Sequence, residues 1–266
     1  MAASGGGPIR GLDHATLVVE ALDSAVTAYE TLFDRPCDAH GSAEGLDWAR
    51  FAVANTALVL VAPREAASPF LAPLPAGVRA AFGAVAFAVE DPAAAARLLE
   101  RRGLPAAGPA LPWLDGAATP LLPASARGLH VLLTAPGPAV GTPGLRLDHL
   151  VIRSADPERS IALLAGRLGL ELRLDRSNPA WGSRLLFFRC GDLVVEVSHD
   201  LAGGIVDAPD SLWGMTWGVP EVAAWHARLE AAGLPVSPLR VGRKPGTRLF
   251  TIRDHAAGIP TAFIGA

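Results

Sequence analysis

The chain has 266 residues, of which 50% are hydrophobic, so it is long and apolar enough to bury a substantial core. Its 23 basic and 26 acidic residues give a formal net charge of -3, which lacks the basic excess that a general nucleic-acid or anionic-membrane binder needs. The two cysteines, Cys37 and Cys190, are too far apart to form a zinc knuckle or a disulfide framework. No apolar stretch approaches the length of about 18 residues that a membrane span needs, so we expect a cytoplasmic protein. We expect it to be a monomer or a homodimer.

In chain order, the first expected element is a strand over residues 11–19, followed by an acidic, alanine-rich segment that is typical of a helix. A second strand at 84–89 leads into a helix at 93–102. This helix is followed by Gly103, a residue suited to the left-handed conformation at a helix C-terminus. A stretch rich in proline and glycine at 137–144 then reads as a linker.

Both patterns return after this linker. Residues 11–19 are matched by 146–154, and residues 84–105 are matched without a gap by 214–235. The chain is therefore a duplication with a first half at 9–136 and a second half at 145–266.

The second half shows the repeated unit more fully. A strand at 148–153 precedes a helix over 157–168, and three strands follow at 170–174, 184–189 and 193–198. The fourth unit has its helix at 222–232, before Gly233. We predict an α+β fold of four βαβββ modules in two homologous halves, with curved mixed sheets covered by helices on their outer face.

These modules resemble the vicinal oxygen chelate superfamily, which includes glyoxalases, bleomycin and fosfomycin resistance proteins, and extradiol dioxygenases. The likeness is carried by Leu-Asp-His-Leu-Val-Ile at 147–152, Arg-Leu-Gly-Leu at 167–170 and Gly-Asp-Leu-Val-Val-Glu-Val at 191–197. Family members pair βαβββ modules around a cleft, where a divalent metal takes ligands from the first and last strands of the modules. The resemblance is specific for the fold and says little about the reaction.

Carried over to this chain, the resemblance makes His149 and Glu196 of the third module the expected catalytic and metal-binding pair. The first module keeps His14, but Leu60 or Val61 stands where the carboxylate would be. The other two modules have only residues that cannot bind metal at these positions, namely Ala84 and Leu132 in the second and Gly214 and Ala262 in the fourth.

Two ligands fall short of the three protein ligands that a functional metal site usually has. His14 would complete a triad only if the first and third modules faced each other. The expected cofactor is therefore a divalent metal, Fe, Mn, Ni or Zn, or none. Glu196 interrupts an apolar strand, so it either faces the cleft or alternates outward to solvent.

Three groups of residues are candidates for substrate binding. Asn178, Trp181 and Arg184 lie in one segment that is either a ligand-gripping loop or an ordinary hairpin loop. Arg243 and Lys244, the only lysine, belong to a cationic segment at 240–248 that is either an anion-binding handle or a solvated turn. Trp217 is expected to line the core or the cleft wall.

Two functions of different classes remain open. The first is a metal-assisted lyase or isomerase, or, with fewer matching ligands, an oxygenase, acting on a small oxygenated substrate that can be anionic. The alternative is a metal-free binding and sequestering protein of the bleomycin-resistance type. In either case we expect the cleft in the second half, with the first half as scaffold, because the first half has hydrophobic replacements and a proline-rich stretch at 105–123.

Overall fold

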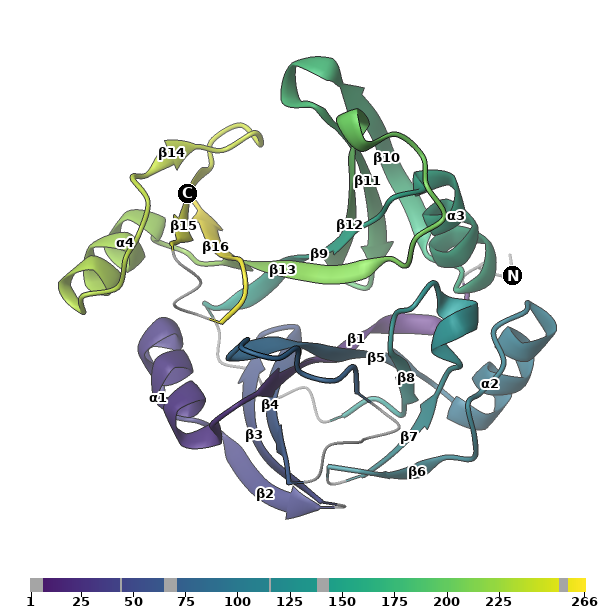
Figure 1. Ribbon diagram of the computed structural model, residues 1–266. Coiled ribbons are helices and arrows are strands. Elements are labelled where there is room, and N and C mark those ends of the chain that lie inside the picture. Colours follow the sequence, from purple (N-terminus) through teal and green to yellow (C-terminus); the bar gives the residue numbers. More distant parts are fainter. Residues whose placement is uncertain (1–6, 44, 65–70, 115, 138–143, 254–257) are drawn as a thin grey trace, which may run out of the picture. The chain divides into compact units, whose positions relative to one another are not determined.

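The computed structural model describes residues 7–43, 45–64, 71–114, 116–137, 144–253 and 258–266 (Figure 1). Four modules follow one another, each with a strand, a helix and three further strands, as predicted. The elements of the first half are β1 (Ile9–Val19), α1 (Leu22–Phe33), β2 (Ala39–Ala43), β3 (Leu46–Val53), β4 (Thr56–Pro63), β5 (Ala80–Val89), α2 (Pro92–Arg101), β6 (Leu111–Trp113), β7 (Gly116–Pro120), the 3-10 turn η1 (Pro123–Ala126) and β8 (Val131–Thr134).

The second half repeats this order with a few additional turns. Its elements are β9 (Arg146–Arg153), α3 (Pro157–Ile161), the π-helical segment η2 (Ala162–Arg167), β10 (Glu171–Asn178), η3 (Pro179–Trp181), β11 (Ser183–Cys190), β12 (Leu193–Asp200), η4 (Leu201–Gly203), β13 (Ser211–Gly218), α4 (Val222–Ala231), β14 (Arg240–Val241), β15 (Arg248–Ile252) and β16 (Thr261–Gly265).

Each half forms one eight-stranded mixed sheet. The orders are β2-β3-β4-β1-β5-β8-β7-β6 and β10-β11-β12-β9-β13-β16-β15-β14, so the two sheets have the same topology. Parallel pairs such as β1 with β4 and β13 with β16 alternate with antiparallel hairpins. The predicted α+β fold of four modules in two halves is confirmed.

Local chemistry explains where the helices begin and end. Asp91 caps α2 by accepting a hydrogen bond from the backbone N–H of Ala94 at 2.9 Å, and Gly103 follows the helix with a φ of 78°. Gly233 follows α4 with a φ of 80°, so both predicted glycine positions are confirmed. The predicted helix at 157–168 changes its winding within its length, because residues 162–167 are π-helical.

The residues pack into two compact units that differ from the two halves. One unit combines the second and third modules, and the other combines the first and fourth. In the second of these, the carbonyl end of α1 is bound by α4, since Arg228 donates to Thr31 O at 2.7 Å and Trp225 donates to Leu32 O at 3.2 Å. Phe33 packs edge-on against Trp217 with ring centroids 4.7 Å apart.

The helices lie on the sheet faces that carry the apolar core, α1 against β3 and β4 and α3 against β12 (Figure 1). Most of the expected linker falls outside the described residues. Within the described part of the chain, no helix is both long and apolar enough to cross a membrane.

Candidate functional site

His149 lies on β9 and is fixed by its neighbour in the sequence. Its Nδ1 is 3.1 Å from a carboxylate oxygen of Asp148, whose other oxygen is 2.8 Å from Arg146. The hydrogen bond with His149 lowers the pKa of Asp148 below its usual value, and the charges of His149, Arg146 and Lys244 act in the same direction, against the effect of burial. Arg146, Asp148, His149 and Lys244 therefore form one electrostatically coupled group, which we call the His149 cluster.

Glu196 lies on β12, where burial alternates along the strand. Val195 and Val197 are buried, whereas Glu196 is half-buried on the other face, directly opposite Phe187 of β11. The apolar face belongs to the side on which α3 packs, so Glu196 points away from that helix. This position agrees with the cleft-facing interpretation, which remains a prediction.

Arg184 belongs to the opposite face of β11. Arg184 pairs in register with His199, three residues along the strands from the Phe187–Glu196 pair. Because side chains alternate between the two faces of a sheet, an odd separation places Arg184 on the other face. Its guanidinium is bound to Asp175 at 2.6 and 2.8 Å and to Glu158 of α3 at 2.7 Å. The structure therefore separates Arg184 from Glu196 and gives it carboxylate partners on the helix-covered side.

The other predicted binding residues have varied surroundings. Asn178 caps η3, since its side chain accepts from the backbone N–H of Ala180 at 3.0 Å. Trp217 is 1% exposed and belongs to the core, so it does not reach a ligand that enters from solvent. Arg243 and Lys244 lie exposed in the turn between β14 and β15, where Thr247 N–H donates to Lys244 O at 3.1 Å.

Trp181, in contrast, lines a pocket of about 580 Å³ at the ends of β11 and β12. Trp181 is 40% exposed, and the guanidinium carbon of Arg176 lies 4.9 Å from the centroid of its ring. The same pocket is lined by His199, which we did not place in the predicted site. The strand alternation Leu193, Val195, Val197 extends to His199 and could have revealed this buried histidine.

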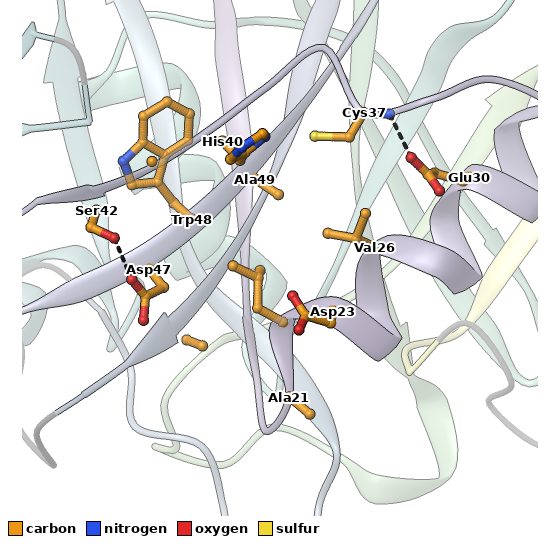
Figure 2. Close-up of a pocket in the computed structure, with 13 residues that line it drawn as sticks. Ala21, Asp23, Val26, Glu30, Cys37, His40, Ser42, Asp47, Trp48 and Ala49 are labelled. Carbon is orange, nitrogen blue, oxygen red and sulfur yellow. Dashed lines mark hydrogen bonds between the residues drawn. The ribbon is translucent and has the colours of Figure 1, made fainter.

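A larger pocket of about 790 Å³ lies in the first half, between α1 and strands β2 and β3 (Figure 2). Glu30 of α1 accepts the backbone N–H of Cys37 at 3.0 Å on one side, and Ser42 donates to Asp47 on the other. None of the predicted site residues lines this pocket.

The first half is densely packed at the positions that match His149 and Glu196. His14 is 3% exposed and Leu60 is fully buried, with Leu60 paired to Leu17 in the parallel register of β1 and β4. Side chains therefore occupy the space at these positions. The assignment of the active cleft to the second half remains a prediction.

Whether the chain could hold a resident metal ion depends on the donor side chains that the structure brings together. Among the described residues, no three His, Cys, Asp or Glu side chains are gathered so that they could hold one ion. At the matching position of β13, Gly214 lies so close to Pro260 that an added Cβ would be 2.8 Å from its carbonyl oxygen. Ala262 pairs with Thr216 and Thr251 and offers no donor side chain. The donor set does not fit a metal site with three protein ligands.

Comparison with known proteins supports the fold. A family model described as Glyoxalase/Bleomycin resistance protein/Dioxygenase superfamily matches residues 146–263. The structure is similar to a triple mutant of 4-hydroxymandelate synthase from Streptomyces coelicolor, with a TM-score of 0.71, 11% identity, and coverage of 97% of this chain and 93% of that one. It is also similar to the Mn(II)-bound glyoxalase from Novosphingobium aromaticivorans, with a TM-score of 0.67, 12% identity, and coverage of 97% and 83%. No protein with a curated description matches the sequence.

Proposed function

We propose that the second half of the chain, in which residues 146–263 match the Glyoxalase/Bleomycin resistance protein/Dioxygenase superfamily model, binds a small oxygenated organic anion without a resident metal ion. This is the binding function rather than the lyase function of the two that the sequence leaves open. Two considerations support it: the charge of the His149 cluster and the shortage of metal donors around it.

The His149 cluster carries the proposal. It contains the cations Arg146 and Lys244 but only one carboxylate, Asp148, whose pKa these neighbours hold low. A local excess of positive charge favours an anion. Asp148 accepts a hydrogen bond from Nδ1 of His149 and thereby orients the imidazole ring.

The turn that holds Arg243 and Lys244 would act as the second contact. Lys244 is close enough for its charge to act on Asp148, so this turn and the histidine serve one ligand in the proposal.

Calorimetric titration with oxalate and malonate tests the proposal. We expect both anions to bind the wild-type protein. Lys244→Ala should bind them at least about tenfold more weakly, because it loses one charge-assisted interaction. Arg240→Ala is the matched control, because it removes a cation from the same hairpin that does not contribute to the pKa of Asp148. Equal binding by all three proteins, or no binding at all, would contradict the proposal.

One observation favours the metal-assisted lyase or isomerase as a second candidate. A histidine whose Nδ1 is held by a carboxylate is the arrangement that commonly orients a metal-binding imidazole. Metal analysis of protein purified without chelator distinguishes the two functions. A stoichiometric Fe, Mn, Ni or Zn ion that disappears in Glu196→Ala would establish this candidate and overturn the metal-free proposal.

A further inference from the structure

The pocket beside Trp181 lies outside the proposed anion site. Its lining comes from the third module and the segment that follows it, and includes none of Arg146, His149, Glu196 or Lys244. It therefore has its own chemistry. The volume of about 580 Å³ lies within the range of small-molecule pockets.

His199 is the most informative residue of this pocket. It is 4% exposed, and its Nδ1 is 3.0 Å from the carbonyl oxygen of Ser154. Because a carbonyl oxygen only accepts hydrogen bonds, Nδ1 must carry the proton. Within the described residues the ring makes no other hydrogen bond, and Nε2 does not belong to the fully buried polar atoms that lack a partner. Nε2 therefore reaches the pocket, and in the neutral ring it is an acceptor.

A buried network holds His199 in this orientation. The hydroxyl of Ser160 lies 2.7 Å from the hydroxyl of Ser154 and donates to Asp210 at 2.9 Å. Ser160 and Asp210 are both nearly inaccessible, so the Ser154 carbonyl that anchors the histidine ring is itself fixed. An acceptor presented in this way by a buried network is pre-organised for a ligand donor.

The remaining lining groups indicate the kind of ligand. The hydroxyls of Ser183 and Ser198 make no side-chain hydrogen bond within the described residues, and each can both donate and accept. One cation, Arg153, and one carboxylate, Asp200, balance in charge. Such a mixture of donors and acceptors without net charge suits a neutral ligand with several hydroxyl groups.

Trp181 adds an aromatic wall to these polar groups. The Arg176 guanidinium stacked over the ring holds the indole in place at the edge of the pocket. The electron-rich face of an indole attracts the weakly positive C–H groups of a saturated ring. A sugar ring offers both of these features, hydroxyls around its edge and C–H groups on its face.

We propose that this pocket binds a neutral polyhydroxylated ring of the sugar type, with His199 Nε2 accepting a hydrogen bond from a ligand hydroxyl and Trp181 stacking on the ring face. The inference does not depend on the proposed anion site, since the two share none of the residues that carry them.

Backbone amide NMR spectra recorded with D-glucose, D-galactose and myo-inositol test the proposal. We expect at least one of these probes to shift the amide signals of Gly182, Ser183 and Gly203 at millimolar concentration. If none of them shifts these signals, or if oxalate shifts them more strongly than any sugar, the assignment of a neutral polyhydroxylated ligand is wrong.

Two variants identify the contacts. Trp181→Ala changes an exposed side chain, so it should keep the fold while weakening binding of the responding probe about tenfold. His199→Phe keeps the ring volume, removes the acceptor and should weaken binding by a similar factor. Trp213→Ala, which removes an indole of similar exposure outside the pocket, is the control. Unchanged affinity in Trp181→Ala would overturn the proposal even if His199→Phe fails to fold.

Long-range proton–nitrogen NMR of the imidazole rings gives an independent readout. The proposed geometry requires His199 to carry its proton on Nδ1 in the neutral state and requires the Nε2 signal to move when the sugar binds. A proton on Nε2 in the neutral ring would contradict the acceptor role.

Discussion

Arg127 Nη2 lies 3.7 Å from a carboxylate oxygen of Asp210, which is buried between the second and third modules and receives no hydrogen bond at that oxygen from the described residues. The other carboxylate oxygen accepts from Ser160. Burial raises the pKa of Asp210, and this effect exceeds the opposing effects of its hydrogen bonds and of the Arg127 charge.

A carboxyl group whose pKa is higher in the folded state binds its proton more tightly there, so its contribution to stability falls as the pH rises above the usual aspartate value of about 4. Asp210→Asn keeps an acceptor for Ser160 and removes the titration. We expect this variant to gain stability relative to the wild type between acidic and neutral pH, measured by urea unfolding at several pH values. Asp207→Asn, at an exposed partner of Arg127, should show no such trend. The opposite trend in Asp210→Asn would mean that Arg127 outweighs burial.

Asp148 should give the opposite pH dependence of stability from Asp210. Its pKa is lowered in the folded protein, so its stabilising contribution is lost as the pH falls. Carboxyl carbon NMR should show that His149→Gln raises this pKa toward the usual aspartate value. Lys244→Ala should raise it by less, since the lysine is the weakest of the causes. If the two variants change the pKa equally, the His149–Asp148 hydrogen bond is not its main determinant.

The two cysteines should differ in reactivity. Burial raises the pKa of the Cys190 thiol to about 12, and the side chain is 1% exposed, so almost no thiolate is present or accessible at mildly alkaline pH. Cys37 is only partly covered. Mass spectrometry after brief iodoacetamide treatment should find Cys37 modified and Cys190 intact, with both modified in urea. Equal labelling of both thiols in the folded protein would contradict this expectation.

Two glycines of the second half form a matched pair for a packing test. A Cβ on Gly265 would lie 2.1 Å from Val219 O, whereas one on Gly166 would meet nothing within 4 Å. Gly265→Ala should therefore cost about 1–3 kcal/mol of unfolding free energy, as other over-packed sites do. Gly166→Ala should be neutral or stabilising by about 0.5–1 kcal/mol, since it restricts the unfolded chain. Chemical denaturation measures both, and equal stabilities of the two variants would refute the steric argument.

Arg228 should contribute substantially to the free energy of unfolding. Its guanidinium donates to Thr31 O at 2.7 Å and to Leu32 O at 3.0 Å, so Arg228→Met leaves carbonyl groups of α1 without these donors while keeping an apolar stem. We expect a loss of about 1.5–3 kcal/mol, typical of hydrogen bonds to a charged group. Arg97→Met on the exposed face of α2 should change the unfolding free energy by less than about 0.5 kcal/mol. Similar losses in both would show that these hydrogen bonds are not responsible.

The fold was predictable because the sequence repeats: similar segments at 84–105 and 214–235 must build similar modules, and Gly103 and Gly233 mark where their helices end. The pairing of modules into compact units was not predictable. It depends on contacts such as that between Arg228 and Thr31, which are 197 residues apart and leave no local pattern in the sequence.

For the candidate site, the sequence predicted strand positions correctly but not the partners of the side chains. The predicted strand at 184–189 includes Arg184, as β11 does, but the ion pair of Arg184 with Glu158 depends on how α3 packs. His199 stands just past the predicted strand at 193–198 and was therefore expected in a turn, whereas β12 continues through Asp200.

The capping of α1 by α4 also bears on how the duplicated chain can change over time. A fragment that contains only the first half would lose the contact of Phe33 with Trp217 and the donors of Arg228 and Trp225. The two copies are therefore no longer interchangeable or separable parts. A substitution at the end of α1 or in α4 that breaks these contacts would therefore affect both copies at once.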